Sequence, residues 1–154
     1  MELLKLDKKV ISYWILTRLP LFLFIQAIDI IIVIFVPKEY LLASLLPTGI
    51  LLLLVIFYTF VMPLLEYRAY SYYYDSEKVV IKSGVFFRSY RVIPILQIQD
   101  VGTLQGPIKI IYKISNIIIS TAGSVENIKN IEITKAKEIV DEINNKIHKR
   151  LIEE

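Results

Sequence analysis

The chain has 154 residues, a net charge of +3 and 55% hydrophobic residues, and its mean hydropathy of +0.57 is too high for an ordinary soluble domain. It contains no cysteine, which excludes disulfides, thiol nucleophiles and cysteine metal sites. The small positive charge suits an anionic membrane surface and is too weak to indicate nucleic acid binding.

The first apolar stretch covers residues 15–36 and is long enough to cross a bilayer as a helix. Pro37 is expected to end that helix. A cleaved signal peptide is the alternative. However, no A-x-A-like site follows the stretch and a second apolar stretch comes at once, so we expect a retained span.

The second apolar stretch, residues 41–65, contains no charged side chain. As a helix it would be about 37 Å long at roughly 1.5 Å per residue, against about 30 Å for the hydrocarbon core of a bilayer. Only residues 37–40 connect the two stretches, so we expect an antiparallel pair of transmembrane helices.

Lys and Arg near the ends of the spans predict the orientation. The connector offers Lys38, whereas the outer ends offer a larger set: Lys5, Lys8, Lys9, Arg18, Arg68, Lys78 and Lys82. We therefore expect a multi-pass protein of the cell membrane with both termini in the cytoplasm. Residues 1–65 would form the N-terminal segment and the two spans, and residues 66–154 a cytoplasmic domain.

Asp29 is the one acidic residue deep in a predicted span, and Gln26 lies one turn before it on the same helix face. An ionisable residue at this depth costs on the order of 3 kcal/mol on insertion scales. Two interpretations stay open. Asp29 is protonated or hydrogen-bonded to Gln26 or a nearby hydroxyl, or it makes an intramembrane contact in an oligomer, as in a small transporter or channel.

After Glu66 the pattern becomes that of strands. Tyrosines alternate over residues 70–74, residues 78–82 form a strand, and Ser83-Gly84 is a tight turn into a returning strand over 85–93. Residues 95–104 form the next strand, with Leu96 and Ile98 on one face and Gln97 and Gln99 on the other.

Residues 108–114 fit either a short helix or a strand, and two further strands follow over 117–121 and 128–133. Thr134 is a plausible N-cap of a C-terminal helix. Its apolar stripe consists of Ala136, Ile139, Val140, Ile143, Ile147 and Leu151. We therefore expect an α+β domain, a curved antiparallel sheet closed by this helix.

Several segments carry a family resemblance: residues 6–14 (LDKKVISYW), the tyrosine-rich 67–74, Gly84, residues 93–101 (IPILQIQDV), Gln105-Gly106-Pro107 and Thr121-Ala122-Gly123. In these the chain resembles the pleckstrin-homology-like (PH-like) domains of small two-span membrane proteins of bacteria and archaea. The resemblance implies a PH-like antiparallel sheet, or partly open barrel, capped by a C-terminal helix, and no known enzymatic activity. One departure is Lys113-Ile114-Ser115, where a glycine is expected in a tight turn.

We expect no catalytic residue, cofactor or metal. His148 is the only histidine, and no second histidine or cysteine completes a metal site. Nucleotide-binding and nucleophile motifs do not occur, and Asp100 has no second acid at useful spacing. A third interpretation is a membrane enzyme that depends on Asp100, and an activity screen of the purified protein would test it.

Two sets of residues are candidates for contacts. Lys82, Arg88 and Arg91 flank the first hairpin and carry the groups that bind phosphate oxygens. Strand alternation puts Arg88 and Arg91 on opposite faces, however, so loose contact with anionic lipid and a solvated surface both stay open. The second set is an uncharged polar row that faces either a partner or water: Gln97, Gln99, Thr103 and Gln105.

The sequence thus predicts a membrane-anchored, non-catalytic PH-like module that mediates protein–protein or protein–lipid contacts at the cytoplasmic membrane face. The expected partners are the lipid bilayer, with anionic lipid as one option, and another protein or a second copy of the chain. Nucleic acid is not expected. The alternative is a subunit of a small oligomeric transporter or channel that uses Asp29.

Overall fold

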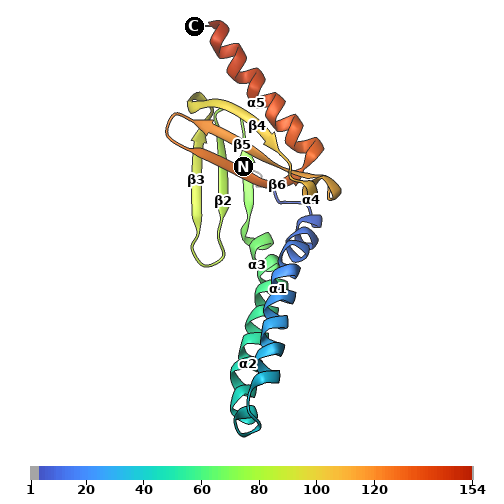
Figure 1. Ribbon diagram of the computed structural model, residues 1–154. Coiled ribbons are helices and arrows are strands. Elements are labelled where there is room, and N and C mark those ends of the chain that lie inside the picture. The colour runs from blue at the N-terminus through green and yellow to red at the C-terminus, as the bar shows by residue number, and fades with distance from the viewer. Residues whose placement is uncertain (1–3, 154) are drawn as a thin grey trace. The chain divides into compact units, whose positions relative to one another are not determined.

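The structure is a computed structural model that describes residues 4–153, with side chains described as far as Lys149. The chain forms two compact units (Figure 1). One, the helical unit, is Ile11–Leu65, and the other, the sheet unit, combines Met1–Val10 with Glu66–Glu154.

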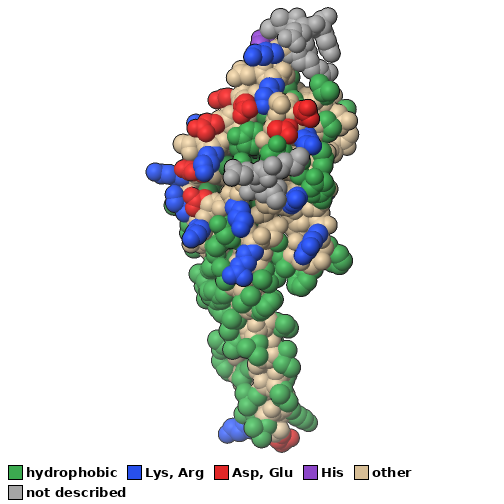
Figure 2. Space-filling view, turned by 180° about the vertical axis from the view of Figure 1, so that it is seen from behind, with side chains coloured by type: hydrophobic (Ala, Val, Ile, Leu, Met, Phe, Trp, Pro, Cys, Tyr) green, Lys and Arg blue, Asp and Glu red, His purple; other side chains and the backbone are tan. Residues whose placement is uncertain are grey.

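The helical unit is built from two long apolar helices. The first is α1 (Lys9–Phe35), and the second is a continuous helical run through η1 (Lys38–Tyr40), α2 (Leu41–Ile56), the π-helical η2 (Phe57–Val61) and α3 (Met62–Ala69). Both are long and apolar enough to cross a membrane, and hydrophobic side chains cover the helical surface seen in Figure 2. The expected pair of apolar helices is confirmed.

The two helices contact each other where the second becomes π-helical. A π-helical turn breaks the regular hydrogen-bond ladder, and the Tyr58 carbonyl in this turn accepts a hydrogen bond from Arg18 Nη1 at 3.2 Å. The Arg18 guanidinium also lies 4.7 Å from the centre of the Tyr58 ring. Phe22 meets Phe60 edge to face with ring centroids 6.2 Å apart.

The first sheet of the sheet unit is antiparallel, in the order β1-β2-β3. Its strands are β1 (Ser71–Tyr74), β2 (Lys78–Ser83) and β3 (Ser89–Pro94). The register pairs Ser71 with Lys82 and, at the other end of the sheet, Lys78 with Pro94. Buried Tyr72, Val79 and Ile93 are part of the core.

The second sheet is also antiparallel, in the order β4-β5-β6. Its strands are β4 (Ile98–Leu104), β5 (Ile114–Thr121) and β6 (Val125–Glu132). Within the described residues β3 and β4 each pair on one side only, so the barrel is partly open. The expected α+β, PH-like architecture is confirmed.

The C-terminal helix α5 (Ile133–Glu153) lies against the second sheet. The predicted stripe is buried at Ala136, Ile139, Val140 and Ile143, whereas Ile147 is half-buried. The side chain of Leu151 lies outside the described residues. The helix begins one residue before Thr134, which was expected to cap it. Burial of the stripe removes apolar surface from water on both the helix and the sheet.

The N-terminal segment forms part of the sheet unit. Leu4 forms an antiparallel bridge with Tyr72, with hydrogen bonds of 2.8 and 3.0 Å between their backbones. Leu6 is buried and its carbonyl accepts a hydrogen bond from the Tyr67 hydroxyl at 3.1 Å. Asp7 Oδ1 accepts from the Lys9 N–H at 2.9 Å and so caps the start of α1. The bridge covers part of the outer edge of β1.

Four predicted strand starts are wrong. β5 and β6 each begin three residues earlier than expected. β3 begins at Ser89 and not at residue 85, because residues 84–88 form a longer loop. Residues 95–97 form the 3-10 turn η3 (Ile95–Gln97) before β4 begins. Leu96 is 70% exposed whereas Ile98 is 3% exposed, so these two residues do not share a face.

Gly84 determines the shape of the loop between β2 and β3. Its φ is +103°, a region open to glycine and strained for other residues. A Cβ atom there would lie 1.8 Å from the Phe87 carbonyl oxygen, which is backbone and cannot move aside.

We expect Gly84→Ala to lower the free energy of unfolding of the sheet unit by more than about 2 kcal/mol, because it combines strain with a backbone clash. Denaturant unfolding of the detergent-solubilised chain measures the change. Gly123→Ala is the control, since a Cβ at Gly123 meets no atom within 4 Å. Equal effects of the two substitutions would contradict this account.

The ambiguous segment 108–114 is mostly helical, since α4 spans Pro107–Ile111. The chain then reverses at Lys113, which has a φ of +53°, and enters β5 at Ile114. Lys113 therefore takes the left-handed conformation at the place where glycine is expected in the family turn. Its carbonyl accepts a hydrogen bond from the Ile133 N–H at 3.0 Å, at the start of α5.

We expect Lys113→Gly to raise the free energy of unfolding by up to about 1 kcal/mol, because glycine takes this backbone conformation without a Cβ penalty. Thermal unfolding in detergent checks the prediction. Lys113→Ala removes the same charge and keeps the Cβ, so it should give no gain. Stabilisation by alanine as well would assign the effect to the charge.

Candidate functional site

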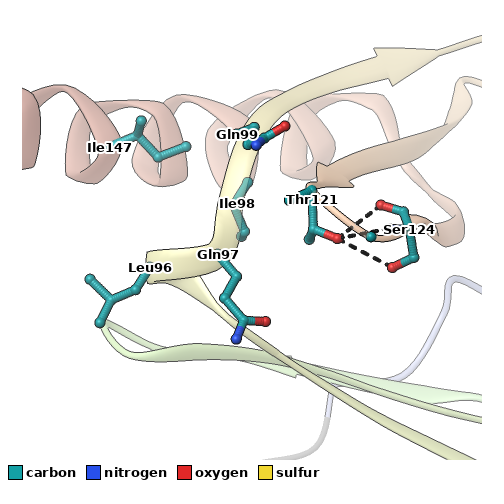
Figure 3. A pocket seen from close by; sticks show the side chains of 9 residues that line it. Leu96, Gln97, Ile98, Gln99, Thr121, Ser124 and Ile147 are labelled. Atoms are coloured by element: carbon teal, nitrogen blue, oxygen red, sulfur yellow. Dashed lines mark hydrogen bonds between the residues drawn. The ribbon is translucent and has the colours of Figure 1, made fainter.

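A groove of about 780 Å³ lies on the sheet unit, where the chain turns from η3 into β4. Figure 3 shows its lining from three places in the sequence: the turn into β4, the β5–β6 hairpin turn and α5. The lining residues are Leu96, Gln97, Ile98, Gln99, Thr121, Ala122, Gly123, Ser124 and Ile147.

Backbone hydrogen bonds and a bulge position the β4 side of the groove. The Ile95 N–H donates to the Glu77 carbonyl at 2.8 Å, which fixes the 3-10 turn to the end of the first sheet. In the register of β4 and β5, Ile98 pairs with Thr121 and Asp100 with Ser120, so Gln99 is the extra residue of a bulge. Bulges redirect side chains at sheet edges, and Gln99 is exposed here.

The opposite side of the groove is a hydrogen-bonded turn. The Thr121 hydroxyl donates to the Ser124 carbonyl at 3.0 Å and accepts from the Ser124 N–H at 3.1 Å (Figure 3). The Thr121 N–H donates to the same carbonyl at 2.9 Å. These bonds hold the exposed Ala122 and Gly123 in one conformation at the rim.

The lining is uncharged. It offers two side-chain amides, two hydroxyls and apolar side chains, and none of the lining residues is acidic, basic or a histidine. Such a surface can form neutral hydrogen bonds and apolar contacts, but it supplies no general acid or base. The groove thus has the chemistry of a binding surface.

The predicted polar row is divided by the structure. Gln97 and Gln99 line the groove together. Thr103 is exposed on β4 outside the lining. Gln105 Nε2 donates to the Ile114 carbonyl at 2.9 Å, so this side chain supports the entry into β5. The partner face stays a prediction, and the geometry brings only its first two residues to the groove.

The three predicted cations do not form one cluster. Lys82 pairs with Tyr90, and Arg91 pairs with Ile81 one position further along, so Lys82 and Arg91 lie on opposite faces of the sheet. Arg91 forms an ion pair with Glu126 of β6. Arg88 lies in the exposed loop before β3. Contact with lipid phosphate stays a prediction, and the geometry favours Lys82 and Arg88 for it.

Gln26 and Asp29 lie on α1, and both are half-buried within the described part of the chain. Gln26 Nε2 is shielded from solvent and has no hydrogen-bond partner there. The structure shows no hydrogen bond between Gln26 and Asp29 among the described residues. The intramembrane contact stays a prediction.

A partly buried polar cluster at the other end of β5 was not predicted. Asn116 Oδ1 accepts from Lys109 Nζ at 2.5 Å and from the Asn130 N–H at 3.0 Å. Asn130 is buried and has a φ of +57°. Desolvation lowers the pKa of Lys109, and the nearby charge of Lys129 lowers it further. The cluster holds α4 and β6 to an irregular part of β5, which is a structural role.

Tyr70 has a structural role of the same kind. Its hydroxyl accepts a hydrogen bond from the Lys129 N–H at 2.9 Å and so joins the chain before β1 to β6. Burial raises the pKa of Tyr70 to about 12, although the hydrogen bond from Lys129 acts in the opposite direction. Tyr70 is therefore a core residue and not part of a ligand cage.

The fold and the apolar helices together define a class, a PH-like module in a membrane protein. A family model described as Bacterial PH domain matches residues 19–147, so the chain belongs to this family. It is 30% identical over 84 residues to UPF0699 transmembrane protein YdbS of Bacillus subtilis (strain 168), over 54% of this chain and 53% of the relative. The chain thus spans about half the length of the curated relative it matches. No solved structure matches the chain.

These comparisons confirm the resemblance on which the sequence analysis relied. The relative is described as a transmembrane protein, and this chain has two helices that fit a bilayer, so a membrane location is supported. Segments that carried the resemblance, residues 96–99 and 121–123, lie together at the groove.

We expect Thr121→Val to lower the free energy of unfolding by about 1 kcal/mol, because it removes the hydroxyl that bonds Ser124 while keeping a similar shape. Thr103→Val is the matched control on the exposed part of β4 and should change stability by less than about 0.5 kcal/mol. Denaturant unfolding compares the two. If neither variant is destabilised, the turn does not depend on this hydroxyl.

Proposed function

We propose that the protein is a membrane-anchored, non-catalytic PH-like module whose groove binds an extended, uncharged segment of a partner protein at the cytoplasmic face of the membrane. The observation that carries the proposal is the position of the groove within the sheet unit. It is open and uncharged, and it lies at the end of the first sheet opposite to the end where the chain enters from α3.

The register supports this position. The chain enters the sheet at Ser71, which pairs with Lys82. The groove follows Pro94, which pairs with Lys78 at the other end of β2. A strand advances about 3.3 Å per residue, so the two ends of β2 are separated by more than about 15 Å. A site at the far end of the sheet suits a protein ligand better than a lipid headgroup.

The free edge of β4 supports an extended ligand. Among the described residues β4 pairs only with β5, so its other edge carries backbone groups that are free of ladder pairing. An added strand can satisfy such groups, while neighbouring side chains select the sequence. The side-chain amides of Gln97 and Gln99 would donate hydrogen bonds to the backbone of that strand and accept hydrogen bonds from it.

Two further points support the proposed setting. Lys and Arg are more numerous around the outer ends of the two helices than in the connector, which favours cytoplasmic termini. Among the described residues there is no group of three or more metal-ligating side chains, and the groove lining has no titratable residue. A lining without titratable groups supports binding over general acid–base catalysis in the groove.

Photocrosslinking in intact membranes tests the function. A photoreactive residue replaces Gln99 in the full chain, and mass spectrometry identifies the crosslinked peptides. We expect adducts with an uncharged segment of a protein, because the side chain at this position lines the groove. The same residue in place of Lys137, on the exposed face of α5, should not give that adduct.

A second variant shows whether the adduct depends on the groove. Ala122→Trp fills the groove from its rim and should abolish the adduct from position 99 while leaving the amount of membrane-inserted chain unchanged. Adducts with lipid only, or a protein adduct that survives Ala122→Trp, would refute the proposed site. Adducts with peptides of the chain itself would show that the groove binds a second copy of this chain and not a different protein.

A further inference from the structure

The loop between β2 and β3, residues 84–88, exposes two large aromatic side chains next to each other. Phe86 is 75% exposed and Phe87 is 92% exposed. Water solvates such side chains poorly, and neighbouring exposed aromatics commonly mark a surface that contacts something apolar. The proposed groove does not include this loop.

The loop is built to present these side chains in one way. The positive φ of Gly84 and the close approach of its backbone to the Phe87 carbonyl oxygen fix the turn. Below the turn, Ser83 pairs with Ser89 and closes the hairpin. A turn held at both ends loses less conformational entropy on binding than a flexible loop would.

The charge around the tip has one sign. Residues 82–90 contain two cations, Lys82 and Arg88, and no acidic residue. Lys82 Nζ lies 5.2 Å from the centre of the Tyr90 ring, and Arg88 next to Phe87 is exposed. Aromatic side chains flanked by Lys and Arg are the composition found where proteins enter the headgroup region of a membrane.

The register places the tip at the end of the sheet where the chain arrives. Ser71 begins β1 two residues after Ala69 ends α3, and Ser71 pairs with Lys82. Because β2 continues past this pair to Ser83 before the turn, the tip extends beyond the start of β1. After Leu65, where the uncharged run ends, residues 66–69 add about 6 Å of helix and the next two residues about 7 Å of extended chain. This short connection limits how far this end of the sheet can lie from the bilayer.

We infer that the tip inserts Phe86 and Phe87 into the interface of the bilayer that holds the helices, with Lys82 and Arg88 at the level of the lipid phosphates. The tip would then be a second attachment point that orients the sheet unit on the membrane. This inference rests on the membrane location and is independent of what occupies the groove.

Depth-dependent fluorescence on the reconstituted full chain tests the inference. The chain has no cysteine, so Phe87→Cys accepts one environment-sensitive dye at the tip. In phosphatidylcholine vesicles with and without phosphatidylglycerol, we expect a blue-shifted emission, quenching by nitroxide lipids and several-fold lower quenching by iodide. The comparison site is Lys137→Cys on the exposed face of α5.

A second pair of variants removes the influence of the dye, which is itself apolar. The dye is placed at Ser89→Cys, with the native tip or with Phe86→Ser and Phe87→Ser together. We expect iodide protection at position 89 to be lost in the double serine variant, while circular dichroism shows the same content of strand and helix.

Several results would overturn the inference. One is equal iodide quenching at positions 87 and 137. Another is protection at position 89 that persists without the two phenylalanines. If protection from iodide is absent in purely neutral vesicles, the tip is held near the lipid by charge alone and does not insert. If protection grows with the protein-to-lipid ratio, the tip contacts a second copy of the chain and not the lipid.

Discussion

The apolar surface of the two long helices is the constraint on which the rest of this protein depends. Large hydrophobic side chains are exposed along most of both helices, and water would not tolerate so large a continuous surface. A bilayer tolerates it because each helix satisfies its own backbone hydrogen bonds. The run without charged residues ends at Leu65, and the first sheet begins at Ser71. The sheet unit therefore works within a short reach of a membrane.

Attachment changes what the sheet unit needs in order to bind. A tethered module meets its partners at a high effective concentration, so contacts that are weak in solution are sufficient. This fits a groove without charges and a loop with two exposed aromatic side chains. The groove and the loop lie at opposite ends of the first sheet, according to the register of β2 with β1 and β3. If the loop enters the interface, the groove is held away from it and stays open to a protein.

Much of the fold could be predicted because periodicity reports burial directly. The two long apolar stretches predicted the two helices, and the stripe from Ala136 to Ile143 predicted the face of α5 that is buried. Tertiary contacts decided the features that were missed. The bridge from Leu4 to Tyr72 and the hydrogen bond from Ile95 to Glu77 join residues far apart in the sequence. No local sequence pattern predicts such contacts.

The candidate site was predictable in part, for a related reason. Gln97 and Gln99 stood out as uncharged polar residues in an apolar segment, and both line the groove. Alternation then assigned them a common face with Thr103, but a bulge at Gln99 breaks the alternation that this assignment required.

The same reasoning failed at the first hairpin, where one error had two consequences. Gly84 was interpreted as part of a two-residue turn, so Phe86 and Phe87 were placed in a strand. With its φ of +103°, Gly84 instead opens a longer loop, which shortens β3 to Ser89–Pro94 and leaves both aromatic side chains in solvent. Arg91 lies opposite Ile81 and forms an ion pair with Glu126, so it is engaged in holding the two sheets together. The conformation of Gly84 thus explains both the wrong strand boundary and the exposure of Phe86 and Phe87. Contact of Lys82 and Arg88 with lipid phosphate stays a prediction.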